Sequence, residues 1–306
     1  MRPPSSALLR LESELRDPIE AIDVDLLQQL WRHDDIVIRC ARPPGLEDQP
    51  DFGQRIRGAM GNVLEGICEA GVDDGTDENP HELLYFWHSP QVSTCFGPLE
   101  LAVPMTVRAE MTSDTVEVVV RLFGRATIHV PMVAAAAIEA LATGVSLRTH
   151  AIRVPFPVID AERRHFDGGA NDWPTAASSA LLRYRSPLII RQGDRLRLEP
   201  EAVVRSCLRR AAALAPWMGF ALAADARALE AAIDTLRYEL AIHPIHWTRT
   251  TRRDPGNPIE VFAYGGSMRM TGPLAPLLPY LGLAKFMSIG GQCASGFGAV
   301  ELIFYP

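Results

Sequence analysis

Hydrophobic side chains recur at helical spacing in three parts of the first 70 residues. Residues 8–15 and 24–31 show this periodicity, and Asp17–Pro18 forms a break between them. A third helix is predicted to follow the loop that begins at residue 49, and its apolar face comprises Ile56, Met60, Val63, Leu64 and Ile67. Glycines inside this helix each lower helix propensity by about 1 kcal/mol relative to alanine. Close packing against a sheet or a ligand would offset that cost.

Short apolar runs in the rest of the first half predict strands. They cover residues 36–40, 83–87, 99–107, 116–123 and 146–154. An Ala-rich helix is predicted over residues 130–143, and residues 73–79 form an acidic loop. Strands interrupted by two helices in this order are typical of a ferredoxin-like unit, in which both helices cover one face of an antiparallel sheet.

A second unit of the same kind is expected after a polar linker over residues 160–174. Its predicted strands cover residues 180–191, 196–198, 259–270 and 299–305, and its predicted helices residues 201–214, 224–240 and 274–283. We therefore expect an α+β protein of two tandem ferredoxin-like (RRM-like) domains. The first spans residues 1–160 with a helical lead-in, and the second spans residues 175–306 with an arginine-rich surface and a C-terminal glycine-rich loop.

Composition is that of a globular protein with a large core, since 47% of the 306 residues are hydrophobic. The longest apolar run, around residues 132–141, is short for a membrane span, and the N-terminus lacks a signal-peptide pattern. We expect a cytoplasmic protein with no membrane partner. The five cysteines are widely spaced and lack metal-ligand spacing, so buried reduced thiols are expected, and neither a metal nor a cofactor.

Charge is distributed unevenly along the chain. The formal net charge is −7, but residues 1–160 carry −11 and residues 161–306 carry +4. All basic residues except Lys285 are arginines, and arginine is the better phosphate fork and base-stacking cation. The acidic total therefore does not exclude a nucleic-acid partner for the C-terminal half.

Four glycines fall within nine positions near the C-terminus, in SIGGQCASGFGAVEL over residues 288–302. A dinucleotide fingerprint is excluded, because Glu301 stands where its third glycine belongs and too few residues remain for a helix. A Walker loop is excluded as well, since no Gly-Lys-Ser/Thr follows. What remains is a loop whose consecutive backbone N–H groups point outward and form a nest for phosphate oxygens.

Two sequence blocks carry a resemblance to a known family. The C-terminal block reads YGGSMRMTGPLAPLLP over residues 264–279, followed by IGGQCASGFGAV over residues 289–300, and Trp247–Arg253 precedes it as an arginine-rich run. A weaker block comprises RGAMG at residues 57–61 and LFG at residues 122–124. These motifs resemble those of the CRISPR precursor-RNA-processing endoribonucleases of the RAMP superfamily, commonly called the Cas6 group.

The resemblance implies tandem ferredoxin-like domains that bind a CRISPR repeat in precursor RNA and cut it once without a metal. A ribose 2′-hydroxyl would attack the adjacent phosphate, leaving a 2′,3′-cyclic phosphate and a 5′-hydroxyl. The product, crRNA, would stay bound as part of an effector complex with other Cas proteins. Such chemistry needs a base for the 2′-proton, an acid for the leaving oxygen and a cation for the charge on phosphorus.

Histidine suits the two proton transfers, because its pKa lies near neutrality. His88, at a predicted strand end, and His246, just before the arginine run, are the catalytic candidates. Arg55 and Arg57, at the start of the predicted third helix, are candidates to hold the scissile phosphate. His33 precedes the first predicted strand, and the histidines at positions 129 and 150, on predicted strands, are expected to be packed or capping groups.

RNA-binding candidates are the basic, glycine-loop and aromatic residues of the C-terminal half. They are Arg183, Arg185, Arg205, Arg209, Arg210, Arg249, Arg252, Arg253, Lys285, Gly290, Gly291, Gln292, Gly296, Gly298 and Tyr264. Trp247 and Tyr264 could stack on bases or belong to the core. Two other functions stay open: a non-cleaving crRNA-binding subunit of a CRISPR ribonucleoprotein, and a metabolic enzyme that uses a phosphorylated small molecule.

Overall fold

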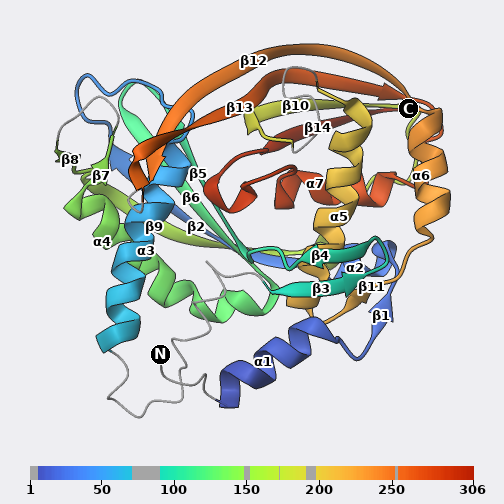
Figure 1. Ribbon diagram of the computed structural model, residues 1–306, viewed down its shortest axis with the longest axis horizontal. Helices are drawn as coiled ribbons and strands as arrows, with labels where there is room; N and C mark the ends of the chain where they lie inside the picture. Colours follow the sequence, from blue (N-terminus) through green and yellow to red (C-terminus); the bar gives the residue numbers. More distant parts are fainter. Residues whose placement is uncertain (1–5, 71–89, 148–151, 172, 191–197, 252–253) are drawn as a thin grey trace. The chain divides into compact units, whose positions relative to one another are not determined.

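The computed structural model describes residues 6–70, 90–147, 152–171, 173–190, 198–251 and 254–306 (Figure 1). The chain forms two compact units. Unit 1 comprises residues 1–171, 212–224 and 294–296, and unit 2 comprises residues 172–211, 225–293 and 297–306. The expected division into continuous domains, 1–160 and 175–306, stays a prediction.

Unit 1 contains a four-stranded antiparallel sheet with the strand order β5-β6-β2-β9. Its strands are β2 (Arg32–Ala41), β5 (Met105–Met111), β6 (Thr115–Phe123) and β9 (Val158–Asp167). Helix α3 (Phe52–Ala70) follows β2, and helix α4 (Val130–Thr143) follows β6. The two helices pack against each other and against strands of this sheet. The main elements therefore follow the order β-α-β-β-α-β.

The core of unit 1 follows from the two periodicities of its sequence. Ile36 and Ile38 pair with Val120 and Val118, and all four side chains are buried. Helix α3 buries Ile56, Met60 and Leu64 at intervals of four residues, as the helical pattern predicted. Because strand residues two apart point to the same face, these positions form one apolar layer between sheet and helices.

The expected linker over residues 160–174 is wrong as far as Asp167, because β9 occupies that stretch. β9 pairs with β2 from Cys40↔Val158 to Arg32↔Asp167. Its side chains are exposed except for Val158 and Phe166, which are half-buried. An edge strand pairs with a neighbour on one side only, and charged side chains are common there. The sequence of β9 is therefore as polar as that of a loop, which explains why it was predicted to be a linker. The predicted strand 146–154 is also wrong, because β7 (Val145–Ser146) and β8 (Arg153–Val154) have two residues each.

Unit 2 contains a second four-stranded antiparallel sheet, with the order β12-β13-β10-β14. Its strands are β10 (Ser179–Leu188), β12 (Arg237–Thr251), β13 (Asp254–Thr271) and β14 (Val300–Tyr305). The helices along this part of the chain are α5 (Pro200–Met218), α6 (Ala226–Thr235) and α7 (Leu278–Met287). β12 and β13 are long neighbouring strands (Figure 1).

The predicted helix 224–240 is too long, because α6 ends at Thr235 and β12 begins at Arg237. The start of β12, Arg-Tyr-Glu-Leu-Ala, contains good helix formers, which explains the error. β12 lies at the edge of its sheet. An edge strand accommodates Pro244, whose missing N–H would interrupt a central strand.

Shorter elements complete the fold. They are α1 (Ser6–Arg16), β1 (Ala21–Ile22), α2 (Val24–Leu30), β3 (Gln91–Thr94), β4 (Gly97–Glu100) and β11 (Ala221–Leu222). The predicted helices 8–15 and 24–31 are confirmed as α1 and α2. The predicted strand 99–107 is interrupted, since β4 ends at Glu100 and β5 begins at Met105. The acidic loop 73–79 and the strand 83–87 lie outside the described residues, as does most of the predicted strand 196–198.

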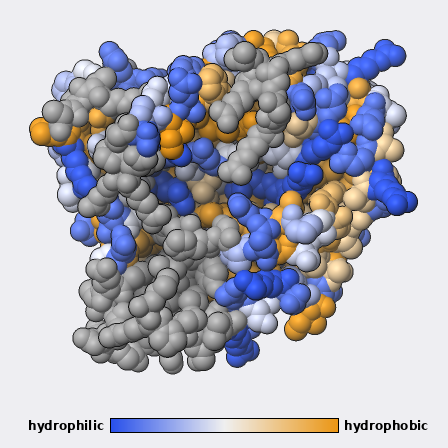
Figure 2. Space-filling view, in the orientation of Figure 1, coloured by the Kyte–Doolittle hydropathy of each residue, from blue (hydrophilic) through white to orange (hydrophobic). Residues whose placement is uncertain are grey.

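The segment Gly124–Thr143, a 3₁₀ turn followed by α4, is long and apolar enough by length and composition to cross a membrane. This corrects the expectation that the apolar run here is too short. Within unit 1, however, Val133, Ala137 and Leu141 are fully buried, and α4 packs on α3 and β2. The segment thus has the contacts of a core helix. Hydrophilic and hydrophobic residues are intermixed on the face of the molecule in Figure 2.

Candidate nucleic-acid interface

The glycine-rich loop (residues 288–299) is held by backbone hydrogen bonds within the loop and to β10. In unit 2, the N–H of Ile289 donates to the carbonyl of Gly298 at 2.9 Å, and the N–H of Gly298 donates to the carbonyl of Pro187 at 3.0 Å. Gly290 and Gly298 have φ values of +88° and +70°, in the left-handed region that favours glycine. Gln292 also has a positive φ, +58°.

The prediction of an outward-facing phosphate nest is wrong for three of these glycines. Gly290 N–H donates to Ser206 Oγ at 2.7 Å, and Gly291 N–H donates to the carbonyl of Ile189 at 2.6 Å. Together with the bond from Gly298, these donors are satisfied within unit 2. Glycine is needed here because a β-carbon at Gly298 would lie 2.8 Å from the carbonyl carbon of Ile289. In unit 1, Gly296 likewise approaches the carbonyl of Val107 too closely for a β-carbon.

Phe297 anchors the loop in a small hydrophobic cluster of unit 2. Its ring stacks on that of Trp247 with centroids 5.4 Å apart and an interplanar angle of 17°, and Ile189, Val261 and Ala263 surround the pair. Trp247 and Tyr264 are only 4% and 5% exposed. The structure therefore assigns both aromatic candidates to the core, where neither ring is open to a base.

Two arginines border the loop, and we call them the arginine pair. Arg249, on β12, reaches Gln292 Oε1 from Nη1 at 3.4 Å, and Arg210, on α5, donates from Nε to the carbonyl of Met287 at 2.7 Å. Arg249 Nε and Arg210 Nη2 are buried, and neither has a hydrogen-bond partner among the described residues. Burial raises the pKa of Cys293, and the nearby Arg210 opposes part of that rise.

Buried guanidinium N–H groups without acceptors are costly, and a phosphate oxygen is the acceptor that satisfies them best. The arginine pair is therefore the described part of unit 2 most suited to bind an anion. Sequence reasoning missed Ser206, whose hydroxyl accepts the Gly290 N–H. The sequence feature that could have pointed to Ser206 is helical spacing, because Ser206 and Arg210 are four residues apart and therefore share a face of α5.

Of the other arginine candidates, three contact acidic side chains, one is exposed on α5 and two lie outside the described residues. Arg205 Nε is 2.7 Å from Glu230, and its Nη2 is 3.3 Å from Asp234. Arg183 and Arg185 reach Glu301 at 3.8 and 2.9 Å. Exposed ion pairs of this kind contribute at most about 1 kcal/mol to stability, so an RNA phosphate can replace the acidic side chain as the partner of each arginine. Arg209 is exposed on α5, and Arg252 and Arg253 lie outside the described residues.

Lys285, on α7, lies over aromatic rings. Its Nζ is 4.6 Å from the ring centroid of Phe286 and 5.5 Å from that of Trp173. Partial burial lowers the pKa of the Lys285 ammonium. The cation–π contacts hold this side chain against α7.

The catalytic candidates do not come together in the described structure. His88 lies outside the described residues. His246 stacks on Phe262 with centroids 4.7 Å apart and lies 4.0 Å from Glu260. Successive strand residues point to opposite faces, so His246 points away from the face of β12 that carries Trp247 and Arg249. The structure does not bring His246 to the arginine pair.

Arg55 and Arg57 belong to α3 of unit 1. Arg55 donates to Asp51 from Nε at 3.1 Å and to the carbonyl of Ser146 from Nη1 at 3.0 Å. Since Asp51 is buried, this ion pair is a structural bond of unit 1, which disfavours Arg55 as a phosphate ligand. Burial lowers the pKa of Arg57 to about 10. No group of three or more His, Cys, Asp or Glu side chains suited to a metal occurs among the residues that the structure describes.

Comparisons with known proteins agree with the resemblance. Residues 182–300, which contain the arginine pair and the glycine-rich loop, match the family model of the CRISPR-associated endoribonuclease Cas6. No curated protein matches the sequence. The solved structure of a "Cas6 (TTHA0078) product complex" shares 16% identity and a TM-score of 0.51, covering 89% of this chain and 99% of the other.

A solved structure of a mutant of the same Cas6 (TTHA0078) shares 14% identity and a TM-score of 0.50, again over 89% of this chain and 99% of the other. Similarity at this level of identity establishes the fold, a mixed α+β fold like that of Cas6. The family match is confined to residues 182–300, in the C-terminal part of the chain, whereas the similarity of fold extends over 89% of the chain.

Proposed function

We propose that this protein binds CRISPR repeat RNA and cleaves precursor crRNA by attack of a ribose 2′-hydroxyl, without a metal cofactor. The observation that carries the proposal is the Cas6 family match over the segment that contains the arginine pair. The chemistry of this segment is consistent with RNA binding, because two partly buried guanidinium groups with N–H donors that lack an acceptor suit the phosphates of an RNA backbone.

The fold supports the same proposal. Unit 1 has the main element order β-α-β-β-α-β, and unit 2 has the same order with the additional helix α6 before β12. Both sheets have their second strand at one edge and their fourth at the other. We infer tandem ferredoxin-like domains from this repeated topology. The net charge of +4 on residues 161–306 favours RNA binding by the C-terminal half.

The remaining parts of the proposal concern the fate of the product. We infer that crRNA stays bound and that other Cas proteins assemble with it in the cytoplasm. The net charge of −11 on residues 1–160 suits a surface for protein partners.

The first test incubates purified protein in EDTA with a CRISPR repeat RNA and with copies that carry 2′-deoxy at single positions. We expect one cut, abolished by one 2′-deoxy substitution, with a 2′,3′-cyclic phosphate on the upstream product. A cut that requires a divalent cation, or that survives every 2′-deoxy substitution, contradicts the proposed reaction.

The second test measures RNA affinity of Arg210→Gln and Arg249→Gln, with Arg237→Gln as the matched control on the same strand as Arg249. Loss of a charged hydrogen bond costs about 1.5–3 kcal/mol, so each arginine-pair variant should raise Kd roughly 10- to 150-fold. The control should stay within about twofold, because Arg237 lies at the opposite end of β12 from Arg249. Equal Kd values for all three variants would refute the arginine pair as the phosphate site.

A non-cleaving crRNA-binding subunit is the second candidate. The observation that favours it is the orientation of His246, which points away from the arginine pair. Tight binding of repeat RNA without any product supports this candidate over the nuclease. Neither binding nor cleavage on any repeat tested would refute both.

A further inference from the structure

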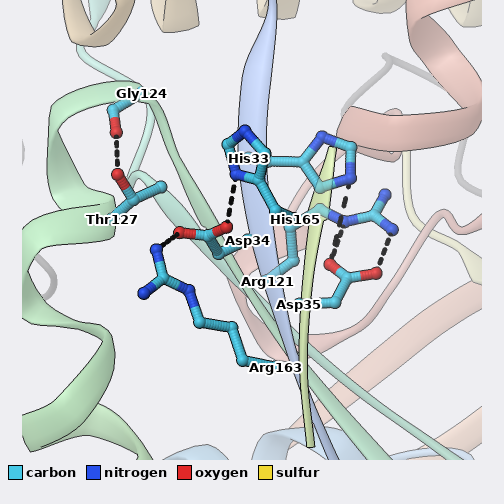
Figure 3. A network of polar contacts seen from close by, with 8 residues as sticks. All are labelled: His33, Asp34, Asp35, Arg121, Gly124, Thr127, Arg163 and His165. Carbon is cyan, nitrogen blue, oxygen red and sulfur yellow. Dashed lines mark hydrogen bonds and ion pairs between the residues drawn. The ribbon is translucent and has the colours of Figure 1, made fainter. Parts of the chain in front are cut away.

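A histidine that the sequence analysis did not select forms a polar cluster with a buried carboxylate in unit 1. One carboxylate oxygen of Asp34, on β2, accepts a hydrogen bond from His165 Nδ1 at 2.8 Å, and the other accepts one from Arg163 Nη2 at 2.6 Å. Figure 3 shows the Asp34 carboxylate between these groups. His165 and Arg163 are two residues apart on β9, so they lie on the same face of the sheet. We call Asp34, Arg163 and His165 the β9 triad.

Burial within the β9 triad is asymmetric. The Asp34 side chain is 1% exposed, whereas the His165 and Arg163 side chains are 60% and 56% exposed. The carboxylate is thus fixed inside the protein while both cationic partners face solvent. A hydrogen bond from Nδ1–H to Asp34 orients the ring and leaves Nε2 as the nitrogen that accepts a proton.

We propose that His165 is the general base of the RNA cleavage, that Arg163 binds the scissile phosphate, and that Asp34 is a positioning residue for both. The inference rests on the proposed function. In the step, His165 Nε2 takes the proton of the 2′-hydroxyl, the 2′-oxygen bonds to phosphorus, and the bond from phosphorus to the 5′-oxygen breaks. The leaving 5′-oxygen takes a proton from water, and His165 then returns its proton to the resulting hydroxide.

Neighbouring groups on the same strands show a different arrangement. Arg121 holds Asp35 through two hydrogen bonds of 2.6 Å, and both side chains are largely buried, 11% and 14% exposed. That pair is closed and structural. His33 is 2% exposed and stacks on Phe166 with centroids 4.6 Å apart, so it belongs to the core.

The β9 triad combines the groups that 2′-hydroxyl chemistry needs. A solvent-facing imidazole and a solvent-facing guanidinium share one carboxylate, which keeps them side by side. Burial of the carboxylate strengthens its interactions with both. Arginine supplies charge to the phosphate, and the imidazole supplies a proton acceptor.

The experiment measures single-turnover cleavage of repeat RNA in EDTA, together with RNA affinity, for wild type, His165→Ala, Arg163→Ala and Asp34→Asn. Arg164→Ala is the matched control, since it is the next residue on β9 and points to the opposite face. General base catalysis contributes about 10²–10⁴-fold, so His165→Ala should lose that much rate with Kd within about twofold. Added imidazole should restore part of the rate, which a purely structural histidine would not allow.

Arg163→Ala should lower the rate and weaken binding, and the control should behave as wild type. If Asp34→Asn unfolds, rescue of His165→Ala by imidazole still decides the question. Wild-type cleavage by His165→Ala overturns the inference while the proposed function stands. A wild-type protein that binds RNA without cutting overturns the role of His165 together with cleavage, and one that does not bind refutes the proposed function itself.

Discussion

Gly298→Ala is the sharpest test of what the glycine-rich loop does. Gly298 has a φ of +70°, and a β-carbon there would lie 2.8 Å from the carbonyl carbon of Ile289 and closer still to its oxygen. These neighbours are backbone atoms and cannot rotate away as a side chain can. The loop must therefore shift to accept alanine.

The expected cost follows from the contacts. A left-handed backbone costs a non-glycine residue roughly 1–2 kcal/mol. A shift of the loop also weakens two hydrogen bonds, from Ile289 N–H to Gly298 and from Gly298 N–H to Pro187, at 2.9 and 3.0 Å, each contributing about 1 kcal/mol. The sum is a loss of about 3–4 kcal/mol, which corresponds to a fall in Tm on the order of 10 °C.

Gly291→Ala is the matched control in the same loop. Its nearest neighbour is Ile189 Cγ2 at 3.4 Å, an ordinary contact, so its Tm should stay close to wild type. Thermal denaturation of both variants and RNA affinity well below Tm separate the two roles of the loop. If Gly298→Ala keeps the Tm of Gly291→Ala but loses RNA binding, the packing account is refuted and a phosphate nest is favoured.

Three further predictions concern stability and thiol reactivity. Phe297→Ala removes the ring stacked on Trp247 and should cost about 3–5 kcal/mol in urea denaturation; a loss below about 1 kcal/mol would contradict the cluster. Burial, and secondarily Arg121, lowers the pKa of His33 from 6.5 to about 2, so the unfolded chain takes up a proton there between those values while the folded protein does not. The free energy of unfolding should therefore fall by about 1.4 kcal/mol per pH unit below 6.5, and His33→Gln should flatten that slope; an unchanged slope would assign it to other groups. Burial raises the pKa of Cys207, so peptide mapping after thiol labelling of native protein should find the half-exposed Cys95 modified and Cys207 protected, and early labelling of Cys207 would show that α5 opens.

Local patterns predicted the helices well and the edge strands poorly. Helix α4 occupies residues 130–143 as expected, because the spacing of apolar residues that predicts a helix can be read from residues close together in the sequence. β9 and β12 were missed, because each depends on backbone pairing with a partner strand. β9 pairs with β2 from a distant part of the sequence, as in Arg32↔Asp167, and its charged side chains do not alternate with apolar ones.

The sequence by itself determined the helices with apolar faces, the α+β class, the resemblance to the Cas6 family and the positions where the backbone needs glycine. It did not determine what those glycines approach. Tertiary structure decided that Gly290, Gly291 and Gly298 pack against the chain's own carbonyls and Ser206, and that Trp247 and Tyr264 are core residues. It also placed His165 on Asp34, 131 residues away. The reason is physical. Where two backbone segments approach closely, the glycine on one of them can be recognised in the sequence, but the segment that it approaches cannot. A hydrogen bond between side chains that are distant in the sequence produces no local pattern at all.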